Sequence, residues 1–446
     1  MTLVLRNVRP WGGDRIDIAL AQGRIAAIGH NLPRAPDEID GRGDVVLPGL
    51  HDHHLHILAL AARRQSIDLT GLCDIAAVRS VLAKSAPVDG WLRAVGYDER
   101  VGGLPDTALL DGWAGDWPLR LQDRTGALWV LNSRGMAHLG NRQLPAGAEL
   151  DAAGRATGRF WREDQWLAGA LARSPPDLAT LGHDLASFGL TALTDATAHN
   201  GPAEARLLAG ALPQHLTLMG SEALPEGRGY MRGPLKLLID ERDAPDPDGL
   251  AARIVAARAQ RRNVAAHCVT EAELVLYLAA LTASGGAHAG DRIEHGGLIS
   301  QEALTVIAEA GLIVVTNPGF IHDRGDRYCA TIAADDRANL YRAQSLLDAG
   351  IPLLAGSDAP YADVDPWLAM RAARDRRTAG GVVLAAQECV GALAALRLFA
   401  PRPITVGSPG DLVLCAGPMT ELLADLGGDR VRATFIAGKM IFERGR

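Results

Sequence analysis

The sequence predicts an α/β protein whose largest part is a (β/α)8 TIM-like barrel. Short apolar segments with the character of buried strands alternate with helical stretches rich in Ala, Leu and Arg, a pattern typical of a parallel α/β fold. The spacing fits one βα unit per strand, since Lys236 and His267 are 31 residues apart and His267 and His295 are 28 apart. Both ends of the chain are instead rich in strands and glycine turns.

Eight segments in the middle of the chain qualify as barrel strands, the number that a closed barrel of this kind requires. In chain order they are VVLPG (45–49), LTALTD (190–195), LTLMGS (216–221), LKLLID (235–240), VAAHCV (264–269), RIEHGG (292–297), LIVVTN (312–317) and PLLAGSD (352–358). A ninth segment, LRLQDR (119–124), competes with them. If it were a barrel strand, one of the eight assignments would be wrong.

An insertion interrupts the barrel after its first strand. About 135 residues separate His56 from LTALTD, where a single βα unit should lie, so we assign residues 62–175 to the insertion. It carries six of the eight tryptophans of the chain: Trp91, Trp113, Trp117, Trp129, Trp161 and Trp166. These side chains predict either an apolar lid over a substrate or a second small core, and we favour the core.

The two β-rich ends are predicted to pair into one small β-sandwich. Residues 1–45 offer the strands LVLRNV, RIDIAL and RIAAIG, and residues 403–446 offer DLVLCAG and VRATFIAGKMIFERG. The alternative is that each end decorates the barrel independently. In the favoured interpretation the barrel occupies residues 46–402.

Composition excludes several classes of function. The net charge is −7 in a chain of 446 residues, which gives no basic face for nucleic acid or an anionic membrane. No apolar run reaches the ~18 residues of a membrane helix, and the opening segment has no signal-peptide core. The five cysteines are scattered without a CxxC pair, so neither disulfides nor a zinc ribbon is indicated. A reduced, cytoplasmic compartment fits this pattern.

Residue types that bind metals recur at the predicted strand ends. PGLHDHHLH (48–56) follows the first strand and contains the HxH pair His54 and His56. Alternate residues of an extended strand point the same way, so these two imidazoles can hold one metal ion. Later strands carry, in order, Lys236, His267, His295 and Asp358. Because the carboxyl ends of barrel strands share one mouth, this series predicts a metal centre there.

These motifs resemble a known family. PGLHDHHLH resembles the PGxxDxHxH signature of the amidohydrolase superfamily, while DRIEH (291–295) and AGSDAP (355–360) resemble its signatures on strands 6 and 8. With both β-rich ends and RTGALWVLNS (124–133), the resemblance covers nearly the whole chain and extends to the subgroup that contains N-substituted formamide deformylase. One departure is Ala127, which stands where that subgroup often has a histidine, so any substrate contact from that histidine is absent.

The resemblance implies a set of site residues and cofactors. The implied metal ligands are His54, His56, His267, His295 and Asp358. It further implies that Lys236 is a carbamate bridging two divalent ions, zinc or alternatively manganese or iron. A lysine flanked by leucines can lose its proton when desolvated, as carbamate formation requires. The resemblance also implies a homodimer that acts on a small molecule.

Several neighbouring residues have competing interpretations. His51 and His53 lie on the other face of the strand pleat and are expected to support the ligands or to pack rather than to bind substrate. Asp52 is expected to make a structural hydrogen bond. Glu222 is the alternative to Lys236 as the group that bridges the two metal ions. The remaining two are expected to be structural: Asp195 as a loop anchor and Cys268 as a packing residue.

The hypothesis for function is metal-assisted hydrolysis of an amide-type C–N bond, linear or cyclic, by a hydroxide that bridges two metal ions. Asp358 is expected to move the proton to the leaving nitrogen. Deamination by a single-metal site ranks second, because deaminases of the superfamily usually carry HxxE after strand 5, and here Glu271 comes one position too late after His267. A metal-free binding protein on the same fold ranks third.

Determinants of the substrate are faint. Arg124 in RTGALW is a candidate partner for a carboxylate, since arginine pairs with carboxylates bidentately. Tyr97 in GYDER and His322, in the loop after strand 7, are candidates for lining the mouth.

Overall fold

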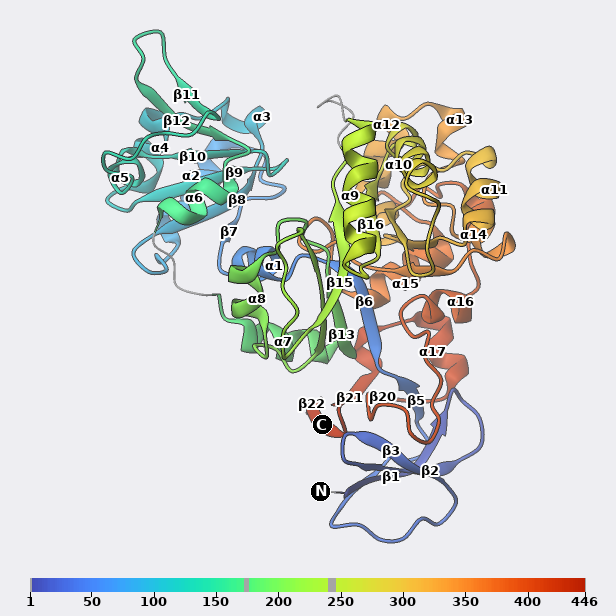
Figure 1. Cartoon of the computed structure of the whole chain (residues 1–446). Helices are drawn as coiled ribbons and strands as arrows, with labels where there is room; N and C mark the ends of the chain where they lie inside the picture. Colours follow the sequence, from blue (N-terminus) through green and yellow to red (C-terminus); the bar gives the residue numbers. More distant parts are fainter. Residues whose placement is uncertain (1, 172–175, 240–245, 446) are drawn as a thin grey trace. The chain divides into compact units, whose positions relative to one another are not determined.

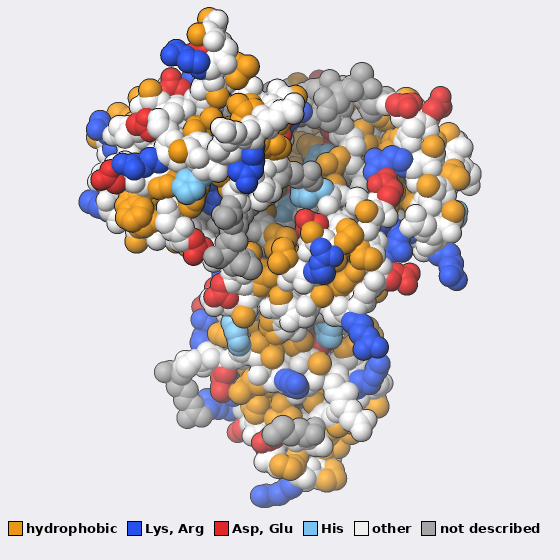
Figure 2. Space-filling model, turned by 60° about the vertical axis from the view of Figure 1, so that its left-hand side comes forward, with side chains coloured by type: hydrophobic (Ala, Val, Ile, Leu, Met, Phe, Trp, Pro, Cys, Tyr) orange, Lys and Arg blue, Asp and Glu red, His pale blue; other side chains and the backbone are white. Residues whose placement is uncertain are grey.

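The computed structural model describes residues 2–171, 176–239 and 246–445 (Figure 1). Its contacts divide the chain into two compact units. One consists of Met1–Ile57 and Leu178–Arg446, and the other of Leu58–Asp177. Every helix within the described ranges is too short or too polar to cross a bilayer. On the face shown in Figure 2, basic and acidic side chains are interspersed over the described surface, as the small net charge leads one to expect.

The first unit contains a barrel of eight parallel strands, which confirms the predicted fold class. In spatial order the strands are β19 (Leu353–Ala355), β18 (Ile313–Thr316), β17 (Arg292–His295), β16 (Val264–Cys268), β15 (Met231–Leu237), β14 (His215–Gly220), β13 (Leu190–Asp195) and β6 (Leu50–Leu55). Seven of them overlap the predicted strands. Asp240, the last residue of the predicted strand LKLLID, lies outside the described residues.

The first barrel strand differs from the prediction. VVLP forms β5 (Val45–Pro48), which pairs with strands of the two chain ends rather than with the barrel. The barrel begins instead at β6, the strand that contains the histidine-rich motif itself. All four residues of β5 are buried, as in a barrel strand, so burial on both faces does not distinguish the two positions.

Hydrogen bonds between β6 and the segment after β19 close the barrel. Asp358 N donates to His54 O at 2.7 Å, and His56 N donates to Ala359 O at 2.8 Å. Gly356 makes this approach possible, because a Cβ there would lie 2.4 Å from the backbone nitrogen of His54. The first and last barrel strands therefore meet at their carboxyl ends.

Helices alternate with the barrel strands in the same unit (Figure 1). They are α7 (Leu178–Ser187), α8 (Pro202–Leu208), α9 (Pro247–Ala259), α10 (Glu271–Ala283), α11 (Gln301–Ala310), α12 (Gly319–Thr331), α13 (Ala334–Arg337), α14 (Ala343–Asp348), α15 (Pro366–Asp375) and α16 (Ala392–Arg397), with a 3-10 turn at Ala386–Glu388. α17 (Met419–Asp425) and a 3-10 turn at Gly428–Arg430 lie between β20 and β21 along the chain. α1 (Ile57–Arg64) begins at the last residue of this unit's first segment, and its other residues belong to the second unit. Local capping fixes where several begin. Thr270 and Glu273 form a capping box at α10, directly after β16.

The two chain ends share one sheet, as predicted for the sandwich. Its strands are β22 (Lys439–Glu443), β21 (Val431–Ile436), β20 (Leu412–Cys415), β5, β1 (Thr2–Pro10), β2 (Ile16–Ala21) and β3 (Arg24–Gly29), with β4 (Asp37–Asp40) paired to β1. β5 and β20 join the two ends through an antiparallel ladder. Side chains from both ends, such as Leu5, Ile18, Leu414 and Phe435, share one buried core. The alternative of two independent decorations is wrong.

The second unit has a six-stranded sheet of its own, in the order β11 (Ala148–Leu150), β12 (Ala156–Trp161), β10 (Leu128–Leu131), β9 (Leu119–Asp123), β8 (Leu92–Tyr97) and β7 (Ile67–Asp68). Its helices are α2 (Ile75–Lys84), α3 (Glu99–Gly102), α4 (Thr107–Ala114), α5 (Ser133–Ala137) and α6 (Asp164–Ala170). The competing segment LRLQDR forms β9 of this sheet, so it does not add a ninth strand to the barrel. Residues 172–175, at the end of the predicted insertion, lie outside the described residues.

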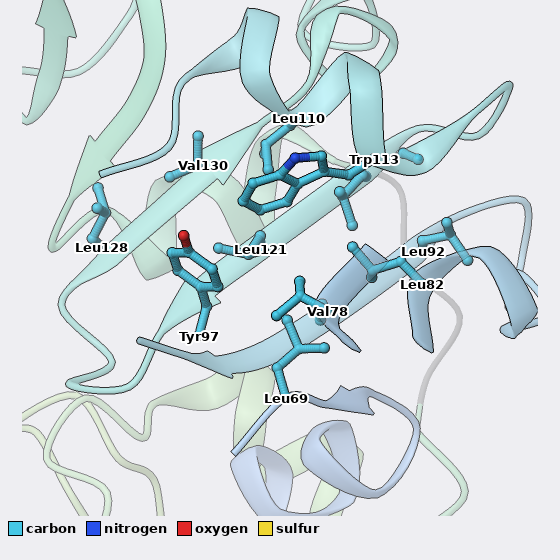
Figure 3. Close-up of a cluster of buried hydrophobic side chains, with 13 residues drawn as sticks. Leu69, Val78, Leu82, Leu92, Tyr97, Leu110, Trp113, Leu121, Leu128 and Val130 are labelled. Atoms are coloured by element: carbon cyan, nitrogen blue, oxygen red, sulfur yellow. The ribbon is translucent and has the colours of Figure 1, made fainter. Parts of the chain in front are cut away.

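Tryptophans of this second unit contribute to its core. Trp113 packs with Tyr97, Leu110 and Leu121 on one side of the sheet (Figure 3). Trp129 belongs to a second buried cluster, against which Trp91 and Trp166 pack. These contacts favour the predicted small core over a lid.

Gly356→Ala tests the closure of the barrel. The added methyl group must push β6 and β19 apart, so we expect it to lower the free energy of unfolding by about 1–3 kcal/mol, as overpacking generally does. Gly112→Ala is the matched control, because a Cβ at Gly112 meets no atom within 4 Å. Denaturant unfolding measures both. A Gly356→Ala protein as stable as the wild type would show that this close approach does not constrain the fold.

Candidate metal centre

The six residues predicted as metal ligands lie at the carboxyl ends of five barrel strands. β6 carries His54 and is followed by His56, β15 carries Lys236, β16 carries His267, β17 ends at His295, and Asp358 follows β19. The parallel arrangement of these strands explains why residues so distant in sequence share one mouth.

Donor atoms of these residues converge on one point. One ligand atom from each of His54, His295 and Asp358 lies within 4.8 Å of the others. Asp358 Oδ1 is 3.1 Å from His56 Nε2 and 3.4 Å from His54 Nε2. The ring of His267 meets that of His295 edge-on, with centroids 4.5 Å apart. The structure thus brings together four imidazoles and one carboxylate.

The far nitrogen of three of these imidazoles is held by another side chain. His54 Nδ1 contacts a carboxylate oxygen of Glu294, which can only accept a hydrogen bond when ionised. His295 Nδ1 lies 2.8 Å from Asn317 Oδ1, whose amide is oriented because its nitrogen donates to Gly356 O. His56 Nδ1 lies 2.8 Å from Thr197 Oγ1. Protonation at Nδ1 leaves Nε2 with a lone pair, as metal ligation requires.

Orphaned polar atoms at this point fit a cation. Asp358 Oδ1 is buried and accepts no hydrogen bond of normal geometry from the described residues, although two imidazole nitrogens lie close to it. Burial lowers the pKa of His267 to about 4 and that of His295 well below its usual value, so both rings are neutral at pH 7. Two neutral imidazoles beside a buried carboxylate belong to the donor set of a zinc-like ion.

Lys236 is the second orphaned group. Its side chain is 2% exposed, and its Nζ has no hydrogen-bond partner among the described residues. Burial lowers the pKa of Lys236, and the nearby Arg292 lowers it further, although Glu294 and Asp358 oppose this. A buried, partnerless amine costs free energy unless a modification or ligand satisfies it.

Glu222, the alternative bridging carboxylate, is not part of the cluster. Its side chain is 47% exposed, and its Oε1 lies 2.7 Å from Arg253 Nε. The structure therefore corrects this alternative, because the carboxylate is already paired outside the barrel mouth.

An ion pair beneath the cluster was not predicted. Arg292 Nε donates to Glu294 Oε1 at 2.7 Å, and Glu294 in turn contacts His54. Arg292 Nη2 also donates to His53 O at 2.8 Å. Arg292 and Glu294 are two positions apart in the segment RIEH of β17, so their side chains lie on the same face of the strand. Two opposite charges at this spacing in a buried strand were the sequence signal that could have revealed the ion pair.

The remaining polar residues of β6 have structural partners. Asp52 Oδ1 accepts hydrogen bonds from His54 N and from Ser357 N, both at 3.0 Å. The rings of His51 and His53 stack with centroids 3.8 Å apart, and His51 Nε2 lies 2.9 Å from Thr194 Oγ1. They point away from the metal centre, as expected from the pleat of the strand.

Asp195 and Cys268 are also structural. Asp195 Oδ2 accepts from Ile57 N at 2.7 Å, and its Oδ1 accepts from Asn200 Nδ2 at 2.8 Å. Asp195 thereby anchors the start of α1. Cys268 is buried, and burial raises the pKa of its thiol well above the usual value.

The structure corrects one of the three predicted substrate contacts. Tyr97 is 1% exposed in the core of the second unit, and its hydroxyl donates to Gly103 O, so it cannot line a mouth (Figure 3). Arg124 lies in the same unit, with its Nε 3.5 Å from Asp98 Oδ2. His322 lies in α12, with its Nδ1 2.9 Å from Asp323 Oδ1. The roles of Arg124 and His322 stay predictions.

Other side chains that sequence reasoning missed lie against the ligands. Phe320 stacks on His295 at 6.4 Å between ring centroids, and Tyr361 meets His56 edge-on at 5.5 Å. The guanidinium of Arg324 lies 3.8 Å over the Phe320 ring and donates to Tyr361 O. No sequence motif marked these three residues.

Two of the ligand positions also have unusual backbone. His295 has φ +72° and Asp358 has φ +59°, in the left-handed region that residues other than glycine seldom adopt. Such conformations persist where the surroundings determine them, often at functional sites. Here the side chain of His295 contacts Asn317 Oδ1, and the backbone nitrogen of Asp358 donates to His54 O.

Comparison with known proteins agrees with this geometry. The sequence model of the amidohydrolase family matches residues 37–441. The chain is 24% identical, over an alignment 519 positions long, to N-substituted formamide deformylase of Arthrobacter pascens, covering 96% of this chain and 95% of that protein. It is 22% identical over 482 residues to a putative amidohydrolase of Bacillus subtilis (strain 168), covering 92% and 91%.

A solved structure shares the fold. It is that of an uncharacterized metal-dependent hydrolase from Pyrococcus horikoshii OT3, with a TM-score of 0.76, 16% sequence identity, and coverage of 94% of this chain and 98% of that one. Because the family model matches most of its length, the chain belongs to the amidohydrolase family and is a hydrolase that acts on C–N bonds other than peptide bonds.

Proposed function

We propose that this protein hydrolyses an amide-type C–N bond, in a linear N-acyl or a cyclic amide, with two divalent metal ions. The ions would be held by His54, His56, Lys236, His267, His295 and Asp358. The observation that carries the proposal is the buried amine of Lys236, which has no hydrogen-bond partner among the described residues and lies beside the imidazole–carboxylate cluster. A linear N-acyl substrate is further supported by the formamide deformylase that aligns with nearly the whole chain.

A carbamate on Lys236 would account for its setting. Burial favours the neutral amine, whose lone pair attacks the carbon of carbon dioxide, and loss of one proton leaves an N-carboxylate. The product is an anion, which can bind a cation directly, whereas an unmodified lysine side chain carries no negative charge. Its two oxygens would supply ligands that the four histidines and Asp358 cannot provide alone.

Asp358 would move the proton during hydrolysis. Bound divalent ions lower the pKa of water and polarise a carbonyl, which makes a nucleophile available at neutral pH. Burial raises the pKa of Asp358, but contacts with His54 and His56 outweigh it and hold the carboxyl ionised. Its carboxylate would accept the proton of the attacking water as the C–O bond forms, then donate it to the nitrogen as the C–N bond breaks.

The wall beside the ligands would contact the substrate. Phe320 and Tyr361 present aromatic surface next to His295 and His56, and Arg324 adds one cation between them. Aromatic surface with one polar anchor is typical of a small-molecule site. We therefore propose that the group attached to the scissile amide lies against these side chains.

A single-metal deaminase is the second candidate. It is favoured by the close approach of only three donors, from His54, His295 and Asp358, which suffice for one ion. This chain has Thr270 at the position, three residues after His267, where such enzymes carry the proton-carrying glutamate, and Glu273 nearby accepts hydrogen bonds from Val269 N and Thr270 N in the cap of α10. The two-metal hydrolase is therefore the better-supported function.

A carbon-13 NMR experiment tests the carbamate. The sequence has only three lysines, of which Lys84 and Lys439 are exposed. Protein loaded with metal in labelled bicarbonate should show one protein-bound carbamate resonance, because only the Lys236 amine is desolvated. We expect Lys236→Met to lose the resonance and the matched control Lys439→Met to keep it. A resonance that survives in Lys236→Met, or none in the wild type, would refute the carbamate.

Asp358→Asn tests the proton carrier and the reaction together. Screening N-substituted formamides and cyclic amides with the wild type should identify a substrate. The variant should then lose about 10²–10⁴-fold in kcat, the usual contribution of a general acid–base, while its unfolding transition is retained. The control is Asp363→Asn in the same loop, which is exposed and should keep full activity. Near-wild-type turnover by Asp358→Asn would show that another group carries the proton.

A further inference from the structure

A second cavity lies within the first unit, near the amino ends of three barrel strands. It has a volume of about 350 Å³, within the range of sites that hold small molecules. Residues 231–234 at the start of β15, Asn263 just before β16 and Arg292 at the start of β17 line it. His51 and His53 of β6 also line it, but the described lining includes none of the metal ligands, so this cavity is a different site.

Four guanidinium groups dominate the lining: Arg232, Arg261, Arg262 and Arg292. Among the described residues only one of them has a buried counter-charge, since Arg292 pairs with Glu294. Glu226 is the one carboxylate of the lining; its side chain is 84% exposed, and its Oε1 is 3.7 Å from Arg232 Nη1. The lining therefore has an excess of positive charge and attracts anions.

The arginines differ in how far their donors are used. Arg262 uses four of its five N–H donors, which it gives to the carbonyl oxygens of Gly220, Ser221, Gly233 and Pro234. Arg261 is exposed and forms no ion pair with any described residue. Arg232 donates through Nη2 to Gln260 at 2.5 Å, but its buried Nε has no partner in the described part of the chain.

A buried imidazole nitrogen adds another unused group to the lining. His53 is 5% exposed and lines the cavity, and its Nε2 makes no hydrogen bond to the described residues. Buried polar atoms are nearly always paired with protein, water or ligand. Nε2 of His53 and Nε of Arg232, which have no partner among the described residues, can therefore form hydrogen bonds to oxygen atoms of a molecule held in the cavity.

We propose that this cavity binds the oxyanion group, carboxylate or phosphate, of a small molecule that is not the substrate. Arg232 and Arg261 supply positive charge to the anion, and Arg262 supports the lining through its hydrogen bonds to four backbone carbonyl groups. Arg292 lines the cavity and pairs with Glu294, which in turn contacts the metal ligand His54. A ligand in the cavity would therefore be connected to the metal centre through this ion pair.

Isothermal titration calorimetry of the metal-loaded full-length protein tests the proposal. Inorganic phosphate and malonate are titrated separately at fixed ionic strength, with sodium chloride as the blank. We expect saturable binding with one site per chain for at least one probe. Binding of phosphate alone assigns the site to phosphate groups, and binding of malonate, with or without phosphate, assigns it to carboxylates.

Variants show where the probe binds. Arg232→Gln and Arg261→Gln should each weaken binding about tenfold, as expected for the loss of a charged hydrogen-bond donor. Arg261 is exposed, so its variant remains informative if Arg232→Gln fails to fold. The control Arg79→Gln changes an exposed arginine of the second unit and should bind normally. Absence of saturable binding, or equal binding by all three variants as expected for anions at the metal centre, would overturn the proposal.

Discussion

The closure of the barrel between β6 and β19 is the constraint on which the metal centre depends. Backbone hydrogen bonds join His54 to Asp358 and His56 to Ala359. Asp52, which lies in β6 like His54, accepts a hydrogen bond from the backbone nitrogen of Ser357. Parallel strands pair only after a long loop has been closed, and here the partners lie some 300 positions apart. The same contacts that complete the sheet therefore place two imidazoles against the carboxylate of Asp358.

Beneath the ligands, a buried ion pair determines which nitrogen of His54 faces the site. Arg292, Glu294 and His54 form a chain of contacts in the barrel interior. Burial of charge is costly unless every partner is satisfied, and a carboxylate between an arginine and an imidazole meets that condition. The arrangement fixes His54 with its Nε2 toward the cluster. Asn317 and Thr197 have the same positioning role for His295 and His56.

Much of this could be predicted from the sequence, because strand spacing and alternation are local properties. Motif order was enough to bring the six ligand candidates to one mouth. The first strand was misassigned because VVLP is apolar throughout, and only its pairing with β20 shows that it belongs to the end sheet. Tyr97 and Glu222 were misjudged for a related reason: burial inside a separate core and pairing with Arg253 are long-range facts. Glu294 was overlooked because its contact with His54 joins two strands that are far apart in the sequence.

The central claim is that the cluster holds two divalent ions. The most direct test is metal content per chain, by plasma mass spectrometry on protein purified without chelator and without a metal-binding tag. The account predicts about two equivalents of zinc, manganese or iron, as a shared two-metal site requires. About one equivalent would contradict the bridging role of Lys236 and favour the deaminase. No metal, even after metal and bicarbonate are supplied, would contradict the assignment of a metal centre.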